Sequence, residues 1–544
     1  MRLCQKLSSN ELILFFFSKQ ISASLNSTPL VLCFTIHATT PKRNQGRIMA
    51  LKKPLWMDAR RCHISLPLRL VASMISLLLL LPLSGAAATV VTHLPGFAGA
   101  LPFYLETGYV GVEEETGTEL FYYFVESERS PSTDPLLLWL TGGPRCSAFS
   151  GLAYEIGPVK FVERRYNGTL PQLVYNPYSW TQMTSIVFLD SPVGSGFSYA
   201  RERRGYDVGD ISSSLQILTF LRKWFDDHPE YLSNPFYIGG DSYAGKMTPL
   251  IAHYVSEGNF KPLHDKRGLA CCSFGIEEMQ YPLINLKGYL VGNPLTGDKI
   301  DDNSRIPYSH SFGIISDQLY EAAVTNCNGD YVNPRNKACT DVVKTIKDLM
   351  SQVCSGGILD PICPFASPKP RRDAHRSKSL AEEHYQLNGP PNEPPLGCVS
   401  YRYYLSYFWA NNIATRASLG IKEGTVRDWI RCNTYSYPYT FDLPNSIKYH
   451  FNLITKGYRA LVYSGDHDLQ VPFSGTHSWI RSFNFSVVDD WRAWHLDGQA
   501  AGFTITYANN LTFATIKGGR HVASENRPKE CFAMAKRWLD RDPL

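Results

Sequence analysis

The stretch "PFYIGGDSYAGKMTPLIAHYV" (residues 235–255) joins a short apolar run to a segment with the pattern of a helix. The apolar run predicts a buried strand, and two glycines mark the turn that follows it. Gly240 lies two residues before Ser242, and Ala244 lies two residues after it. Because only small neighbours fit around a tight strand-to-helix turn, the stretch predicts a serine hydroxyl lifted above a sheet as a nucleophile. Taken alone, it is also compatible with an ordinary loop.

Several other apolar runs end in glycine-rich or polar loops, and helical patterns such as residues 211–229 lie between them. Continuous apolar runs of this length are typical of buried parallel strands. Strands that alternate with helices indicate an α/β sheet, which places its sites at the carboxyl ends of the strands. The runs are "PLLLWLTGG" (135–143), "SIVFLDSPVGSGFSY" (185–199), "LKGYLVGNP" (286–294), "YRALVYSGDHD" (458–468) and "LTFATIKGGRH" (511–521).

Two of the later runs supply partners for Ser242. A serine hydroxyl needs a nearby base, and the base needs a group that orients it. Asp468 follows one predicted strand and His521 follows another, which gives the order Ser–Asp–His found in α/β-hydrolases. We expect His521 to take the proton from Ser242 and Asp468 to orient the imidazole. Asp466 is an alternative acid, and His467 is interpreted as a loop residue.

Backbone N–H groups must also stabilise the oxyanion that forms when a serine attacks a carbonyl. We expect one such group from Tyr243, directly after the nucleophile. The second is expected from the early glycine loop of Gly142 and Gly143. A plain β-turn is the alternative interpretation of that Gly-Gly-Pro loop.

The net charge of +5 originates at the start of the chain, because residues 1–88 hold eleven Lys or Arg against two Asp or Glu. The rest of the chain is net negative, so we expect no nucleic-acid partner. Basic residues, an apolar stretch and three alanines follow one another in residues 49–88, which predicts a secretory signal peptide. A membrane anchor is the alternative, but we expect no stable anchor. Residues 1–48 are interpreted as a gene-model extension.

The thirteen cysteines are consistent with an oxidising compartment. Three N-x-[ST] tripeptides predict glycosylation sites in a secreted protein. These acceptors are Asn167, Asn484 and Asn510. Together with the signal peptide, they place the chain in the secretory pathway.

Residues 304–440 interrupt the alternation of strands and helices, and we interpret them as a cap insertion. The core is then expected in two parts, residues 89–303 and 441–544. Within the cap, residues 366–396 are polar and proline-rich without apolar periodicity, which is typical of a loop or disordered linker. Residues 259–283 are interpreted as an atypical surface insertion, with a functional loop as the alternative.

The combined motifs resemble the serine carboxypeptidase family, and among its members the plant serine carboxypeptidase-like proteins. The motifs are "LPGFAGALPFYLETGYVGV" (94–112), "GGPRCS" (142–147), "DSPVGSGFSY" (190–199), "GGDSYAGKMTPLIA" (239–252), "GNPLTG" (292–297), "YSGDHDLQVP" (463–472) and "GGRHVASE" (518–525). The resemblance implies an α/β-hydrolase fold with a central, mostly parallel sheet and a helical cap. It assigns the nucleophile, acid, base and oxyanion donors to Ser242, Asp468, His521, Gly143 and Tyr243.

The family contains carboxypeptidases, which hydrolyse C-terminal peptide bonds at acidic pH, and acyltransferases, which move acyl groups from 1-O-glucose esters to alcohols. Carboxypeptidases of this family usually have Asn and Glu where this chain has Thr141 and Asp241. Both differences favour the acyltransferase branch, with an acyl glucose ester and an alcohol acceptor as substrates. Peptide hydrolysis is the alternative. We expect Thr141, Gly142 and Asp241 to contact the substrate.

Three departures from the family pattern bear on activity. Arg145 stands beside the oxyanion loop where the family usually has Gly, so it is expected either to bind an anionic substrate or to block the site. Arg520 replaces the glycine before the base, and Val522 and Ser524 replace the usual Thr and Pro. A catalytically impaired binding protein is therefore a second alternative.

The resemblance also implies a disulfide between Cys146 and Cys398. It implies another within Cys327–Cys363, with Cys327–Cys339 as the expected pair and Cys354–Cys363 as a third bridge. Cleavage near Lys369–Arg372 would then leave two chains joined by a disulfide. We expect no cofactor and no metal, and the family relationship indicates a vacuolar or extracellular location.

Overall fold

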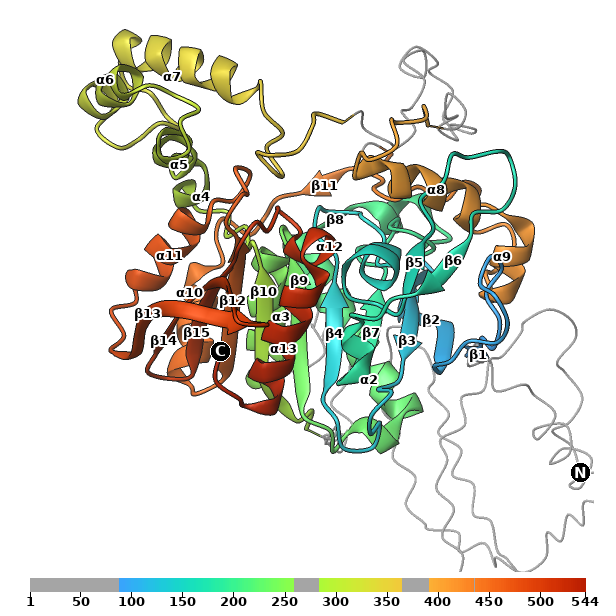
Figure 1. The fold of residues 1–544 in the computed structure, drawn as a ribbon. Helices are drawn as coiled ribbons and strands as arrows, with labels where there is room; N and C mark the ends of the chain where they lie inside the picture. Colours follow the sequence, from blue (N-terminus) through green and yellow to red (C-terminus); the bar gives the residue numbers. More distant parts are fainter. Residues whose placement is uncertain (1–87, 259–282, 364–390, 435) are drawn as a thin grey trace, which may run out of the picture. The chain divides into compact units, whose positions relative to one another are not determined.

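The computed structural model describes residues 88–258, 283–363, 391–434 and 436–544 (Figure 1). The predicted extension at 1–48 and almost all of the predicted signal region lie outside the described residues. The same holds for the insertion at 259–282 and for most of the polar linker, residues 366–390.

An eleven-stranded sheet organises the described chain, in the order β1-β2-β3-β7-β4-β9-β10-β12-β15-β14-β13. The strands from β7 to β15 in this order are parallel, and antiparallel strands flank them on both sides. The predicted α/β-hydrolase class with a mostly parallel central sheet is therefore confirmed. The strands are β1 Thr89–Val90, β2 Leu105–Glu113, β3 Thr118–Val125, β4 Leu136–Leu140, β7 Ser185–Leu189, β9 Phe236–Asp241, β10 Leu286–Gly292, β12 Arg459–Gly465, β13 Val487–Leu496, β14 Gln499–Tyr507 and β15 Leu511–Ile516.

Helices cover both faces of this sheet, because its central strands are apolar on both sides. In β4, Leu137 and Trp139 face one buried cluster, and the leucines between and around them face the other. The first cluster contains side chains of α8 Ser400–Ala410 and of α13 Pro528–Asp540, and Figure 1 shows α13 lying across the sheet. The second contains α2 Asp210–Asp227, α3 Ala244–Ser256, α10 Ile447–Thr455 and α11 Phe473–Arg481.

The chain between β10 and β12 is mainly helical where it is described. Its residues 306–346 form a small separate core in which the side chains of α6 and α7 pack together. Asparagine and serine side chains cap these two helices at their N-termini. The elements are α4 Lys299–Asn303, α5 Arg305–Ser311, α6 Asp317–Cys327, α7 Lys337–Met350, α8, α9 Ile413–Ser418, β11 Tyr439–Thr440 and α10, and β11 pairs with β8 Val208–Gly209.

The remaining elements are short. Strand β5 Val159–Phe161 pairs with β6 Leu173–Tyr175, and α12 Ala523–Asn526 precedes α13. Single helical turns occur at η1 Gly151–Glu155, η2 Trp180–Gln182, η3 Arg203–Tyr206 and η4 Pro229–Tyr231. Among the described residues, no helix combines the length and apolar character needed to cross a bilayer.

Candidate active site

Ser242 lies at the corner between β9 and α3. Its φ of +57° is in the left-handed region, which turns the chain sharply out of the strand. Small residues are required on both sides of this corner. A Cβ on Gly240 would lie 2.3 Å from the Leu140 carbonyl oxygen, and one on Gly142 would lie 2.6 Å from the Ser242 Cβ. The predicted strand–turn–helix is therefore present, with the neighbouring oxyanion loop packed directly against the serine.

The side chains of Ser242, His521 and Asp468 form a continuous hydrogen-bonded chain. His521 Nε2 lies 2.6 Å from Ser242 Oγ, and His521 Nδ1 lies 2.8 Å from Asp468 Oδ2. Because a carboxylate only accepts, Nδ1 carries a proton and donates it to Asp468, which leaves Nε2 free to accept from the serine. Burial lowers the pKa of His521, but the adjacent Asp468 charge and hydrogen bond outweigh this and raise it overall.

Several groups besides His521 hold the Asp468 carboxylate. It accepts hydrogen bonds from the backbone N–H groups of Gln470 and Val471 at 2.7 and 3.2 Å, and from the Asn293 side chain at 2.8 Å. Asn293 was not identified from the sequence, although its position directly after a buried strand in "GNPLTG" was a usable signal. Asp466, the alternative acid, instead contacts His467.

The two expected oxyanion donors are near the nucleophile, since Tyr243 follows Ser242 and the loop of Gly143 packs against it. Neither the Gly143 N–H nor the Tyr243 N–H has a hydrogen-bond acceptor among the described residues. Gly143 has a φ of +64°, which suits glycine and places this loop in a tight turn. Unsatisfied N–H groups near a nucleophile are what an oxyanion site needs.

A buried pair of carboxyl groups lies beneath the oxyanion loop. Asp241 Oδ1 accepts from the Gly142 N–H at 3.2 Å, and Glu155 Oε2 accepts from the Trp139 indole at 2.7 Å. Burial raises the pKa of Asp241 to about 6. Burial and the nearby Asp241 charge raise the pKa of Glu155 well above its usual range. Glu155 was not identified from the sequence, because no spacing rule links it to the serine.

The other two residues expected to contact substrate differ in their surroundings. The Thr141 hydroxyl is buried and has no hydrogen-bond partner among the described residues. Arg145 is only 1% exposed, and its guanidinium donates to backbone carbonyl oxygens. The expectation that Arg145 binds an anionic substrate or blocks the site is wrong, because its side chain is buried in the wall beside the loop.

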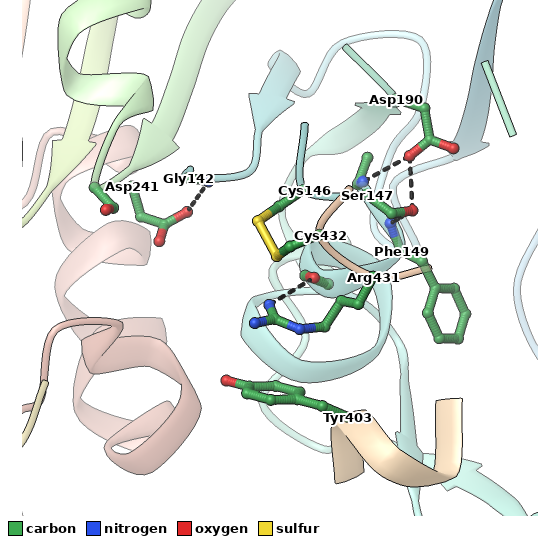
Figure 2. Close-up of a disulfide and its surroundings, with 12 residues drawn as sticks. Gly142, Cys146, Ser147, Phe149, Asp190, Asp241, Tyr403, Arg431 and Cys432 are labelled. Carbon is green, nitrogen blue, oxygen red and sulfur yellow. Dashed lines mark hydrogen bonds between the residues drawn. A yellow bond between two sulfur atoms is a disulfide. The ribbon is translucent and has the colours of Figure 1, made fainter. Parts of the chain in front are cut away.

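The disulfide pattern differs from the expected one. Cys146 bonds to Cys432 (Figure 2), and backbone hydrogen bonds on both sides of the pair hold the two loop segments together. Cys398 instead bonds to Cys363, 35 residues away. The predictions of Cys146–Cys398 and Cys354–Cys363 are therefore wrong, and Cys354 is a free thiol. Cys327–Cys339 is present as expected, joining α6 to α7.

Figure 2 also shows how the residues after Cys146 are held. The Asp190 carboxylate accepts from the Ser147 hydroxyl at 2.8 Å and from the Ala148 N–H at 2.7 Å. Arg431, next to Cys432, lies 3.8 Å from the centre of the Tyr403 ring. The loop that follows the oxyanion donors is thus fixed by a covalent bond and by a buried carboxylate.

The cap contacts the two loops that carry the acid and the base. The His521 N–H donates to the Gly356 carbonyl oxygen at 2.7 Å, and the Leu469 N–H donates to that of Ser355 at 2.9 Å. The side chains of Arg520 and Asp360 form an ion pair at 2.6 Å. Arg520 therefore joins the cap to the histidine loop and does not occupy the nucleophile's surroundings.

The glycosylation acceptors and one sizeable cavity lie away from the relay side chains. Asn167, Asn484 and Asn510 are all exposed, as glycosylation requires, and their modification remains a prediction. A cavity of about 680 Å³ is lined by residues of 194–207 and 423–438, and by none of the three relay side chains.

Comparisons with known proteins agree with this geometry. The sequence model of the serine carboxypeptidase family matches residues 95–541. Serine carboxypeptidase-like 19 from Arabidopsis thaliana is 46% identical over 84% of this chain and 95% of its own length. Serine carboxypeptidase-like 3 from the same plant is 45% identical over 84% of this chain and 94% of its own.

A solved structure supports the fold independently. The prohormone-processing carboxypeptidase from Saccharomyces cerevisiae has a TM-score of 0.59 and 17% identity, covering 81% of this chain and 92% of its own. At that identity the similarity concerns the fold alone. From the family match and the extent of the similarity to the plant proteins, the chain belongs to the serine carboxypeptidase family and has its α/β-hydrolase fold.

Proposed function

We propose that this protein is a serine acyltransferase that moves an acyl group from a 1-O-glucose ester to an alcohol through an acyl-serine. The observation that carries the proposal is the relay itself, with 2.6 Å from His521 Nε2 to Ser242 Oγ and 2.8 Å from His521 Nδ1 to Asp468 Oδ2. These distances suit proton transfer from the serine to the imidazole and stabilisation of the resulting imidazolium.

In the first half of the reaction, Ser242 Oγ attacks the ester carbonyl while His521 takes the serine proton. The Gly143 and Tyr243 N–H groups donate hydrogen bonds to the developing oxyanion. When the tetrahedral intermediate collapses, His521 returns the proton to the glucose oxygen, which leaves as a hydroxyl. The acyl group remains on the serine.

In the second half, the acceptor's hydroxyl attacks the acyl-serine. His521 removes the acceptor proton and then returns it to Ser242 as the new ester leaves. Water would give hydrolysis by the same steps, so the choice between transfer and hydrolysis depends on which nucleophile occupies the site.

Residues near the nucleophile favour the transferase branch. Thr141 and Asp241 replace the Asn and Glu that family carboxypeptidases use for the terminal carboxylate of a peptide. The side chain of Asp241 is one methylene shorter than Glu and is already bonded to the Gly142 N–H. The free Thr141 hydroxyl is better suited to a neutral hydroxyl or ester group than to a full negative charge.

One observation favours the alternative, a serine-type carboxypeptidase. Burial raises the pKa of Asp241 to about 6 and raises the pKa of Glu155 well above its usual range. Below pH 6 the Asp241 carboxyl group would hold a proton and could donate a hydrogen bond to a peptide's terminal carboxylate. Peptide cleavage confined to acidic pH would therefore support this alternative.

The test offers the purified protein glucose esters of several acids together with alcohol acceptors, and blocked dipeptides in parallel, between pH 4.5 and 8. We expect ester transfer without dipeptide cleavage, and no reaction with Ser242→Ala. Dipeptide cleavage alone would overturn the transferase proposal. Inactivity toward both substrates, with a folded protein that does not react with a fluorophosphonate, would favour a binding protein.

Secretion to the vacuole or the cell exterior is proposed on the basis of the signal-like sequence and the disulfides. Both Cys146–Cys432 and Cys363–Cys398 connect the chain across the polar linker. If a protease cuts that linker, these two bridges would hold the products together. A gel of the natural protein with reductant would then show two bands, and a gel without reductant would show one band.

A further inference from the structure

Arg145 occupies an unusual position in the oxyanion loop. Its φ of +69° is in the left-handed region, which arginine rarely adopts and glycine adopts freely. It is two residues after Gly143, the expected oxyanion donor, and directly before the disulfide-bonded Cys146. A long charged side chain at such a backbone position requires contacts that keep it there.

The guanidinium of Arg145 binds carbonyl oxygens from three separate segments. Nη1 donates to the Val193 carbonyl oxygen, and Nη2 donates to those of Tyr206 and Pro438, both at 2.7 Å. The Tyr437 and Tyr439 rings lie 5.4 and 5.9 Å from the guanidinium carbon.

This burial has an electrostatic cost that the contacts must offset. Burial lowers the pKa of Arg145 to about 10, so the side chain remains charged at neutral pH. None of its direct hydrogen-bond partners is a carboxylate among the described residues. The charge is instead neutralised by carbonyl dipoles and aromatic faces.

The contacts of Tyr439 extend to Tyr243, the second expected oxyanion donor. The hydroxyl groups of Tyr243 and Tyr439 both donate to Asp210 Oδ1. Lys246 pairs with Asp210 Oδ2 at 3.1 Å and completes this buried cluster. Asp210 thus fixes Tyr243, the residue after the nucleophile. The neighbouring Tyr439 ring and Pro438 carbonyl fix Arg145.

We propose that Arg145 is a positioning residue for the oxyanion site, whose guanidinium holds the Gly143 loop at the distance from Tyr243 that a tetrahedral intermediate requires. This inference rests on the proposed acyl-serine chemistry but not on the identity of the acyl group. It replaces the idea of a substrate-binding cation, because every hydrogen bond of the guanidinium goes to the protein's own backbone.

The test compares Arg145→Gly with a matched control, Arg416→Ala. Glycine suits the left-handed backbone, so the substitution removes the side chain without adding strain. Arg416 likewise donates to backbone carbonyls, at Val426 and Arg427, and lies 5.6 Å from the Phe197 ring, but it does not contact the oxyanion loop.

The probe is p-nitrophenyl acetate, whose acylation needs only the nucleophile and the oxyanion site. We expect Arg145→Gly to lower kcat by about 10- to 100-fold with KM nearly unchanged, because a misplaced donor costs less than the 10²–10³-fold of a missing one. Inhibition by phenylboronic acid, which forms a tetrahedral adduct on the serine, should weaken by a similar factor. Arg416→Ala should leave both quantities within twofold.

Chemical rescue separates positioning from general stability. Arg145→Gly leaves a guanidinium-sized space beside the cavity that Gly194, Tyr206 and Tyr437 line. We expect guanidinium at tens of millimolar to restore part of kcat, and urea, which has nearly the same shape without the charge, to restore none. If Arg145→Gly does not fold, Arg145→Lys replaces it, with a several-fold loss of kcat expected.

Each outcome has a consequence for the inference. An unchanged kcat in Arg145→Gly, or in Arg145→Lys where that variant replaces it, overturns it. A loss in Arg145→Gly that guanidinium does not rescue, or a loss that Arg416→Ala shares, also overturns it. If the wild-type protein reacts with neither p-nitrophenyl acetate nor a fluorophosphonate, the proposed acyl-serine chemistry fails and this inference fails with it. An active wild type with an unaffected Arg145→Gly rejects the inference alone.

Discussion

A single methyl group added at Gly142 tests whether the nucleophile and the oxyanion loop are packed as tightly as the structure indicates. In the variant Gly142→Ala, the added Cβ would lie 2.6 Å from the Ser242 Cβ and 2.8 Å from the Asp241 carbonyl oxygen. Carbon atoms in contact normally lie about 3.5–4.0 Å apart, so roughly 1 Å of movement is needed. The φ of Gly142 is not positive, so steric contact and not backbone strain is what changes.

That movement would act directly on the relay. The distance from Ser242 Oγ to His521 Nε2 is 2.6 Å, and an increase of about 1 Å takes it beyond hydrogen-bonding range. Misplacement of a reacting group by about 1 Å costs on the order of 10²-fold in rate, which is about 2.7 kcal/mol of activation free energy. Overpacking at this site should also lower the protein's free energy of unfolding by about 1–3 kcal/mol.

The assay measures kcat and the burst amplitude with p-nitrophenyl acetate, and thermal unfolding in parallel. Gly111→Ala is the control, because no atom lies within 4 Å of a Cβ at Gly111 and its φ is also not positive. We expect the control to stay within twofold of wild type. A folded Gly142→Ala protein with kcat within threefold of wild type would refute the reasoning, since the serine would then have room that the structure does not show.

Three further outcomes follow from the charged groups. Asp468→Asn should lower kcat by about 10⁴-fold, because the amide cannot fix the imidazole tautomer or stabilise its cation. The raised pKa of His521 should put the acid limb of kcat/KM above pH 6.5, and Asp468→Asn should move that limb to lower pH; a wild-type midpoint below 6.5 would contradict this. His228 contacts the Trp224 carbonyl and Glu106, each at 2.9 Å, so both its ring nitrogens donate. Burial lowers the pKa of His228, but Glu106 raises it overall. The stabilisation that charged His228 contributes is therefore complete below pH 6.5 and is lost as pH rises through the raised pKa. Burial raises the pKa of Glu106, but His228 and tyrosine hydroxyl groups lower it overall. The stabilisation that charged Glu106 contributes is therefore lost as pH falls below 4.5. The loss of unfolding free energy in His228→Gln, about 1–3 kcal/mol, should therefore be largest between pH 4.5 and 6.5, and a loss that does not vary with pH would argue against the charged pair.

The sequence was sufficient for the parts of the site that depend on strand ends. Ser242, Asp468 and His521 each follow a buried parallel strand, and parallel strands bring their carboxyl ends to one edge of a sheet. Their order along the chain and the small residues around Ser242 carry enough information to predict which three loops meet. The distances and the imidazole orientation required the structure.

Other features depend on contacts between segments that no local pattern encodes. Cys146 bonds to Cys432 because two loop segments form an isolated β-bridge there, and cysteine spacing does not fix connectivity. The direction of the Arg145 side chain depends on carbonyl groups 48 to 293 residues away. Glu155 becomes part of the site only through burial next to Asp241.

The cap meets the acid and base loops through main-chain atoms of residues 355–358, since the N–H groups of Leu469, His521 and Ile358 all take part in these bonds. Main-chain hydrogen bonds of this kind can form whichever side chain the residue carries. Substitutions of Ser355 or Ile358 can therefore change the side chains beside these loops while the main-chain bonds to Leu469, His521 and His467 are kept. Such a separation would let related proteins vary the side chains near these loops without moving the Ser242–His521–Asp468 relay.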